Sequence, residues 1–142
     1  MEITQYLNPV KLSIPVKETG CSIFEHTFFL KPGDDVDVTQ FQIAFLGVTD
    51  DRNSNNPGTS ASASTIRRYL YNLQIPSKTT NFIDLGDVKD GASINDTYFA
   101  IGEIINFLEK ANVFIIIFGA SQEMILPILI ATSSKQNSKI SI

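Results

Sequence analysis

From residue 41 onwards the chain alternates between continuously apolar runs and segments with helical periodicity. The runs at 41–48 and 113–118 predict buried strands, and the run at 81–87 predicts a shorter strand that leads into a glycine-containing turn. Because only the first and last runs are apolar throughout, we expect those two strands to be buried on both faces. The 81–87 strand is expected towards an edge of the sheet.

Amphipathic helices are predicted between these strands. The first has apolar residues at i, i+3, i+4 and i+7, namely Ile66, Tyr69, Leu70 and Leu73. The second repeats helical spacing at Ile101, Ile104, Ile105 and Leu108. The expected N-caps are Ser62 or Ser64, Asn95 or Asp96, and Ser121 before a third helix. Pro127 must make that third helix start late or kink.

Residues 1–40 lack this alternation and are punctuated by prolines, so we expect an irregular N-terminal arm before a domain over 41–142. Within the arm, 24–30 is a candidate edge strand or hairpin arm. The last residues, 139–142, look like the beginning of a fourth strand of the domain. The alternating order predicts an α/β fold, a three-layer α/β/α architecture with a mainly parallel sheet.

The composition argues against two classes of protein, those that bind nucleic acid and those that span a membrane. The 142 residues are 43% hydrophobic and 18% charged, which is enough apolar material for a core. A net charge of −4, with Arg67 and Arg68 as the only basic pair, argues against a nucleic-acid partner. Cys21 is alone and the N-terminus lacks signal-peptide features, so we expect a cytoplasmic protein. The apolar stretch 113–131 contains central polar residues, so no membrane span is predicted.

Candidate binding residues lie in the long polar loop at 49–64, because ordered loops of that length tend to be functional. The loop carries several polar side chains, among them Arg52, Asn53 and Asn56, and a guanidinium can hold a carboxylate through two hydrogen bonds. The alternative is a solvated loop rich in turn-forming residues, and the sequence does not decide between the two.

Polar residues at other strand ends are further candidates. Asp84 and Asp87 suit a paired acid and base or metal ligands, although a role in satisfying backbone N–H groups is favoured for both. Ser121, Gln122 and Glu123 follow the 113–118 strand, where helix capping and turn geometry compete with a divergent active site. The structural role is favoured there as well.

Five weak motifs in register resemble the N-terminal part of the ureohydrolase family, which comprises arginase, agmatinase and formimidoylglutamase. They are 43–48, Arg52-Asn53 with Asn56 and Gly58, 65–73, 84–87 and 96–97. The resemblance covers about residues 41 to 142 and is greatest to formimidoylglutamases and related arginase-like proteins. It implies a partial arginase-like fold, with Arg52, Asn53 and Asn56 at the rim of the site as the best candidates for contact with a small-molecule ligand.

The chain departs from the family where metal would bind. Family members end the third strand in Gly-Gly-x-His, whose imidazole is the first ligand of a two-manganese centre, but here residues 119–122 end in Gln122. A carboxamide is a neutral and weak ligand. The family's Asp-x-His-x-Asp and Asp-x-Asp-x-x-Asp motifs do not occur, and the first would be expected directly after 139–142. We therefore expect no cofactor and no tightly bound manganese in this chain.

These observations predict that the chain is the N-terminal portion of a ureohydrolase-like protein and that this portion is not catalytic by itself. Alternatively, the chain is part of a metal-dependent enzyme of arginase or formimidoylglutamase type, which hydrolyses linear amidine or guanidine C–N bonds. The remaining metal ligands of that enzyme would lie beyond residue 142. Half of such a sheet leaves an unpaired strand edge, so we expect self-association, most simply a two-fold dimer, or a missing C-terminal half.

Overall fold

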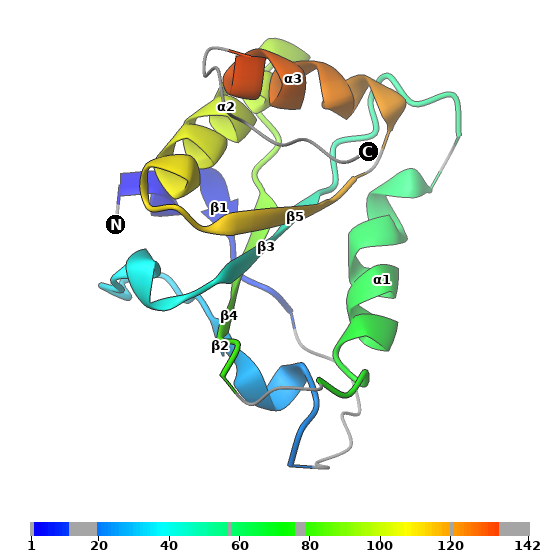
Figure 1. Ribbon diagram of the computed structural model, residues 1–142. Coiled ribbons are helices and arrows are strands. Elements are labelled where there is room, and N and C mark those ends of the chain that lie inside the picture. The colour runs from blue at the N-terminus through cyan, green and yellow to red at the C-terminus, as the bar shows by residue number, and fades with distance from the viewer. Residues whose placement is uncertain (1, 12–19, 57, 76–78, 120, 134–142) are drawn as a thin grey trace.

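The computed structural model describes residues 2–11, 20–56, 58–75, 79–119 and 121–133. Over these ranges the chain is an α/β protein with one mixed sheet of five strands and three α-helices (Figure 1). The strands are β1 (Leu7–Asn8), β2 (Thr27–Phe29), β3 (Ile43–Val48), β4 (Phe82–Val88) and β5 (Phe114–Phe118). The α-helices are α1 (Ser62–Leu70), α2 (Ile94–Lys110) and α3 (Ile125–Ser133). Short 3-10 helices are η1 (Glu2–Tyr6), η2 (Phe24–His26), η3 (Val38–Gln40), η4 (Thr59–Ala61) and η5 (Gln122–Met124).

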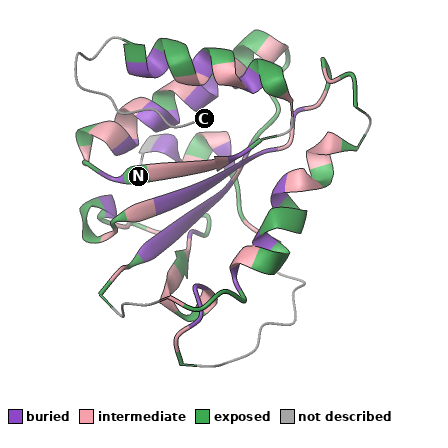
Figure 2. Cartoon of the chain, turned by 45° about the vertical axis from the view of Figure 1, so that its right-hand side comes forward, coloured by how far each residue is buried: buried purple, intermediate pink, exposed green. Residues whose placement is uncertain are grey.

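The strand order corrects the expectation from apolar content. Strand β4 lies inside the sheet, with β3 parallel to it on one side, and β5 lies at an edge, parallel to β3. The other side of β4 is paired by two N-terminal strands, β2 in parallel along its first half and β1 in antiparallel along its second. Figure 2 accordingly shows buried central strands beside a half-buried β5. Apolar content did not predict the order of the strands because two strands from residues 1–40, β1 and β2, pair along the other side of β4.

The N-terminal residues contribute to the same core as the later elements. Ile3, Leu7, Leu30 and Val38 are all buried in the larger hydrophobic cluster. The prediction of an edge strand within 24–30 is confirmed by β2. The predicted strand at 139–142 lies outside the described residues.

Alternate residues of β3 enter two separate apolar clusters. Ala44, Leu46 and Val48 join the larger cluster with residues of α2 and α3, whereas Phe45 joins a smaller cluster with residues of α1. This is the period of two expected for a strand that is covered on both faces. The predicted apolar face of α2 is confirmed, since all four of its residues are buried: Ile101, Ile104, Ile105 and Leu108.

Helix α1 presents a different face to the sheet from the one that its apolar residues predict. Ile66, Tyr69 and Leu73 are 40%, 69% and 56% exposed, whereas the buried residues of the helix are Ala63 and Arg67. Tyr71, one turn after Arg67, is also buried. The prediction was wrong because a charged and a hydroxylated side chain are buried against polar partners on β4, as described below.

The helix caps also differ from those expected. The N-cap of α1 is Ala61, the last residue of η4, which provides no side-chain cap, so neither Ser62 nor Ser64 is the N-cap of this helix. Helix α2 begins at a capping box in which Ser93 is the N-cap and Asp96 is its reciprocal partner. In α3, Pro127 lies in the first turn, where a missing backbone N–H removes no helical hydrogen bond.

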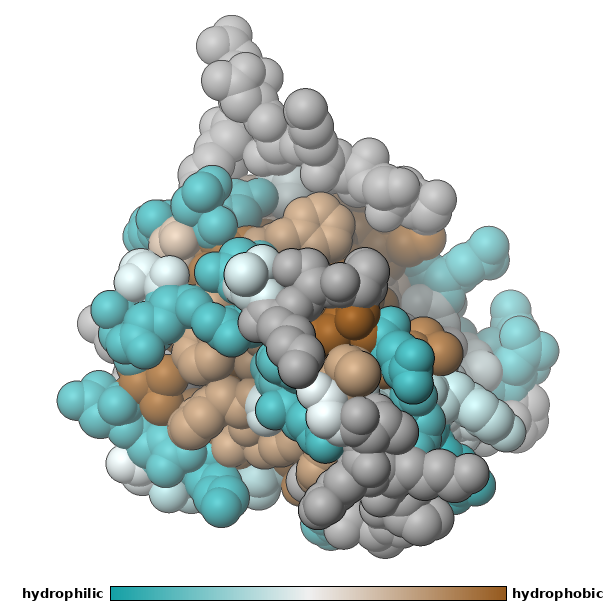
Figure 3. All heavy atoms as spheres, turned by 60° about the horizontal axis from the view of Figure 1, so that its bottom comes forward, coloured by the Kyte–Doolittle hydropathy of each residue, from teal (hydrophilic) through white to brown (hydrophobic). Residues whose placement is uncertain are grey.

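The outer surface is not uniformly polar. Figure 3 shows apolar residues that reach the surface between hydrophilic ones on the side that is lowest in Figure 1. No α-helix in the described part of the chain is both long and apolar enough to cross a lipid bilayer.

Candidate binding site at the carboxyl ends of β3 and β4

The most buried polar group of the sheet is the Asp84 carboxylate, which lies in the middle of β4 with no exposed surface. Arg67 of α1 reaches it with two hydrogen bonds, from Nε to Oδ2 at 2.8 Å and from Nη2 to Oδ1 at 2.9 Å. The guanidinium also lies 5.5 Å from the centre of the Phe118 ring. A buried ion pair with two parallel hydrogen bonds therefore joins α1 to the central strand.

The remaining positions around Asp84 are occupied as well. The Tyr71 hydroxyl donates to Oδ2, and the backbone N–H of Gly86 donates to Oδ1 at 2.8 Å. The Gly86 carbonyl accepts from Nη2 of Arg67 at 2.9 Å. Gly86 has a φ of +91°, and a Cβ there would come within 2.0 Å of the Asn8 carbonyl, so this position requires glycine. Both Asp84 oxygens are thus committed within the protein.

The electrostatics keep this network in one protonation state. Burial alone would lower the pKa of Arg67, but hydrogen bonds and charge from Asp84 and Asp87 outweigh it and raise the pKa. Burial, followed by the charge of Asp84, raises the pKa of Tyr71. Arg67 therefore stays cationic and Tyr71 stays a neutral donor, which suits a structural network better than acid–base chemistry.

Asp87 links this buried network to a cavity. Its Oδ1 accepts from Nη1 of Arg67 at 2.5 Å, while a quarter of its side chain is exposed. A Cβ at the neighbouring Gly47 would come within 1.9 Å of that oxygen, so the close packing of β3 against Asp87 needs glycine. The cavity has a volume of about 510 Å³. Its lining comprises Asn8, Pro9, Val10, Lys11, Thr49, Ser60, Ser64, Arg67, Arg68 and Asp87.

Cations predominate in this lining. Arg67 is neutralised by two aspartates, whereas Lys11 and Arg68 are exposed and form no salt bridge with any carboxylate in the described ranges. Asp87 is the one acidic residue among the lining residues, and Arg67 already holds one of its oxygens. The cavity is therefore suited to an anionic ligand near Lys11 and Arg68.

Arg52, the predicted ligand-binding residue, is held in a second polar cluster near the carboxyl ends of β3 and β4. Its Nε donates to Oδ1 of Asp50 at 2.8 Å, and its Nη2 lies 2.5 Å from Oδ2 of the same carboxylate. Thr97 of α2 donates to Asp50 at 2.7 Å, and the Ala92 carbonyl accepts from Nη1 of Arg52 at 3.2 Å. The Arg52 guanidinium therefore connects the loop after β3 to the residues at the start of α2.

Asp50 is the charged centre of that cluster. The hydrogen bond from Arg52 lowers the pKa of Asp50 to about 2, against the opposing effect of burial. Burial, with repulsion from Asp50, raises the pKa of nearby Asp90. Asp50 remains ionised at neutral pH and holds Arg52 in place.

The other predicted loop residues are not gathered into a site. Asn53 and Asn56 are exposed, and neither side chain forms a hydrogen bond with another described residue. The role of Arg52, Asn53 and Asn56 in ligand binding stays a prediction. Two of the three guanidinium nitrogens of Arg52, Nε and Nη2, are already bonded to the Asp50 carboxylate.

The residues after β5 do not match a metal centre. Gln122 is exposed at the start of η5, and Ser121 lies next to Glu123, with 3.5 Å between the hydroxyl and a carboxylate oxygen. Ser121 is the N-cap of η5 but forms no side-chain cap bond. No group of three metal-ligating side chains occurs within the described ranges, and Asp84 is fully engaged by Arg67 and Tyr71. The residues present do not fit the two-manganese site that the family resemblance implies.

The site residue that the sequence pattern does not predict is Arg67, which stands out in the sequence only as half of a basic pair. A signal was present, since Ala63, Arg67 and Tyr71 are spaced at i, i+4 and i+8 and so share one helix face. An aspartate inside the apolar run 81–87 needs a buried partner. Joining the two observations would have suggested the pair.

Comparison with models of known protein families, and with curated protein sequences, finds no match for this chain.

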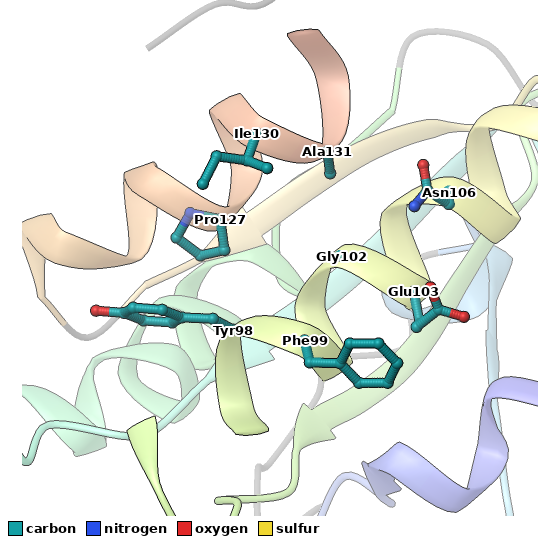
Figure 4. A pocket seen from close by; sticks show the side chains of 8 residues that line it. All are labelled: Tyr98, Phe99, Gly102, Glu103, Asn106, Pro127, Ile130 and Ala131. Carbon is teal, nitrogen blue, oxygen red and sulfur yellow. The ribbon is translucent and has the colours of Figure 1, made fainter. Parts of the chain in front are cut away.

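A second hollow lies between α2 and α3 and is mostly apolar (Figure 4). This groove of about 360 Å³ is lined by Tyr98, Phe99, Gly102, Glu103, Asn106, Pro127, Ile130 and Ala131. Figure 4 shows Pro127 and Ile130 directed from α3 towards α2, with Glu103 and Asn106 at one end of the groove. Few polar groups converge there, so the cavity beside Asp87 is the better candidate for recognition of a small polar ligand.

Proposed function

We propose that the chain is the N-terminal portion of a ureohydrolase-like domain of three-layer α/β/α architecture that binds a small carboxylate and is not catalytic by itself. The observation that carries this proposal is the cavity at the carboxyl ends of β3 and β4. Open α/β sheets bind their ligands at that edge. A cytoplasmic location is part of the same proposal.

The arrangement of charge supports a carboxylate as the ligand. Lys11 and Arg68 each provide a cation that has no carboxylate partner among the described residues, and Ser60 adds a hydroxyl to the same lining. The Asp87 carboxylate repels anions from the inner end of the cavity. The ligand's carboxylate is therefore expected between Lys11 and Arg68 rather than against the buried Arg67.

The chemistry of the remaining side chains supports a binding role over catalysis. Asp84 is sealed from solvent by its partners, and the position that supplies histidine in the resembled family holds Gln122. Neither of the family's acidic ligand motifs occurs in the sequence. A water activated by two metal ions needs several carboxylate and imidazole ligands, and this chain offers no comparable set within the described residues.

Ligand titration followed by NMR chemical shifts tests the binding role, with L-glutamate as a carboxylate probe and agmatine as a related probe that lacks a carboxylate. We expect L-glutamate to shift amide signals of Ser60, Ser64 and Arg68, and agmatine to leave them unchanged. Arg68→Gln should weaken L-glutamate binding by at least about 10-fold, because a hydrogen bond to a charged group contributes roughly 1.5–3 kcal/mol. Lys110→Gln, which removes an equal charge at the end of α2, is the matched control and should change nothing.

Binding of L-glutamate that is insensitive to Arg68→Gln, or no binding at all, would refute the carboxylate site. A separate measurement tests the non-catalytic role, by elemental analysis of protein purified without chelator and by product assay. Near-stoichiometric manganese, or release of urea, ammonia or formamide from arginine, agmatine or formimidoylglutamate, would instead favour the metal-dependent hydrolase.

A further inference from the structure

The groove between α2 and α3 has open space over one position of α2. Gly102 lies inside this helix and lines the groove, and a Cβ at Gly102 would meet no atom within 4 Å. Its φ is not positive, so the backbone conformation does not require glycine here. A glycine inside a helix destabilises the helix relative to alanine. The helix therefore leaves this space open at a cost in stability that neither its backbone nor a neighbouring atom imposes.

The walls of the groove are apolar and aromatic. Helix α3 contributes Pro127, Ile130 and Ala131, and no residue of this helix is charged. Helix α2 contributes the rings of Tyr98 and Phe99 (Figure 4). The volume of about 360 Å³ lies within the range of small-molecule sites, which is about 300–1,000 Å³. Such sites are typically apolar, with a few polar groups that fix the orientation of the ligand.

The polar groups of this groove lie at one end and carry a single charge. Glu103 is the one charged residue among the described residues that line it, and Figure 4 shows Glu103 and Asn106 at the same end. Neither Lys nor Arg occurs three or four residues before or after Glu103, the positions that neighbour it on the helix surface. Phe99 lies one turn before Glu103, and its ring meets the Tyr6 ring edge-on at 6.4 Å between centres. A carboxylate and an aromatic ring both attract a cation, so this end of the groove is suited to positive charge.

We propose that this groove binds a small organic cation with an apolar body, of the arylalkylammonium class. The ammonium group donates to the Glu103 carboxylate, and the apolar body lies over Gly102 against Pro127 and Ile130. Glu103 disfavours an anion, and the apolar walls disfavour a wholly polar molecule because its polar groups would lose water without gaining partners. This site is separate from the cavity beside Asp87 and does not depend on the function proposed above.

NMR titration of the full chain with 2-phenylethylammonium tests the proposal, with 2-phenylethanol as the neutral probe and 3-phenylpropanoate as the anionic probe. We expect the ammonium probe to shift amide signals of Gly102, Glu103 and Ala131, and to leave those of Ser60 and Ser64 in the other cavity unchanged. It should bind at least about threefold more tightly than the alcohol, and the carboxylate probe should bind most weakly. Threefold corresponds to about 0.65 kcal/mol, which lies within the range measured for exposed ion pairs.

Two variants separate the contribution of the charge from that of the open space. Glu103→Gln should abolish the preference for the ammonium probe over the alcohol. Gly102→Leu should weaken binding of both probes by at least 10-fold because its side chain fills the groove, and it should stay folded because leucine favours a helix more than glycine does. Asp35→Asn removes an equal charge from an exposed residue that does not line the groove, and this control should keep the preference.

Three results would overturn the proposal: no shifts at the groove with the ammonium probe, equal affinity for that probe and the alcohol, or a preference that Asp35→Asn reduces as much as Glu103→Gln. The last result would assign the attraction to the net charge of −4 and not to Glu103. Circular dichroism checks that each variant is folded. If Gly102→Leu does not fold, Gly102→Ala takes its place and should weaken binding of both probes by at least about twofold. Unchanged affinity in the folded Gly102 variant would place the bound probe outside the groove.

Discussion

Removal of the Arg67 guanidinium should be among the most destabilising single changes in this protein. Arg67→Met keeps much of the side-chain volume but removes both hydrogen bonds to Asp84, whose carboxylate has no exposed surface. Among the described residues, the Tyr71 hydroxyl and the Gly86 N–H would then be the remaining hydrogen-bond donors to the Asp84 carboxylate. Loss of one partner of a buried ion pair costs about 3–5 kcal/mol, which is a large part of a typical stability of roughly 5–15 kcal/mol.

Urea unfolding followed by far-ultraviolet circular dichroism measures this change, since the chain contains no tryptophan for fluorescence. Arg68→Met, at the next and exposed position of α1, is the control and should lie within about 0.5 kcal/mol of wild type. In the Arg67→Met background, Asp84→Asn should recover part of the loss because the unpaired charge disappears. A loss below about 1 kcal/mol in Arg67→Met would show that the buried pair contributes little, and so refute the reasoning.

Two further predictions concern neighbouring hydrogen bonds. Tyr71→Phe removes the hydroxyl that donates to Asp84 and should lower the free energy of unfolding by about 1–3 kcal/mol in urea titrations, and an unchanged midpoint would contradict it. The pKa of Asp50 is lowered from about 3.8 to about 2, so the Arg52 bond stabilises the fold fully above pH 5 and is lost as the pH falls towards 2. Because Arg52 is 41% exposed, we expect a contribution of only about 1–2 kcal/mol. Asp50→Asn should therefore be less stable than wild type at pH 7 and approach it near pH 2, and a pH-independent difference would exclude this account.

Local sequence pattern determined the elements whose buried positions are mostly apolar. The runs at 43–48, 82–88 and 114–118 form strands, and the apolar face of α2 was predictable to the residue. In each case the pattern needs no knowledge of the partner, because any apolar surface stabilises an apolar side chain. Alternation of strands and helices likewise sufficed for the α/β class.

Only the tertiary structure decided which elements became neighbours. Strand β4 is internal because β1 and β2 pair along it, and β5 is left at the edge despite its apolar sequence. Helix periodicity groups the residues of α1 into faces. It does not say which face is buried when the sheet carries a polar partner such as the Asp84 carboxylate. The Arg67 side chain outweighs the apolar flank of α1 because a buried carboxylate at Asp84 requires a paired charge, and that requirement links residues 17 positions apart in the sequence.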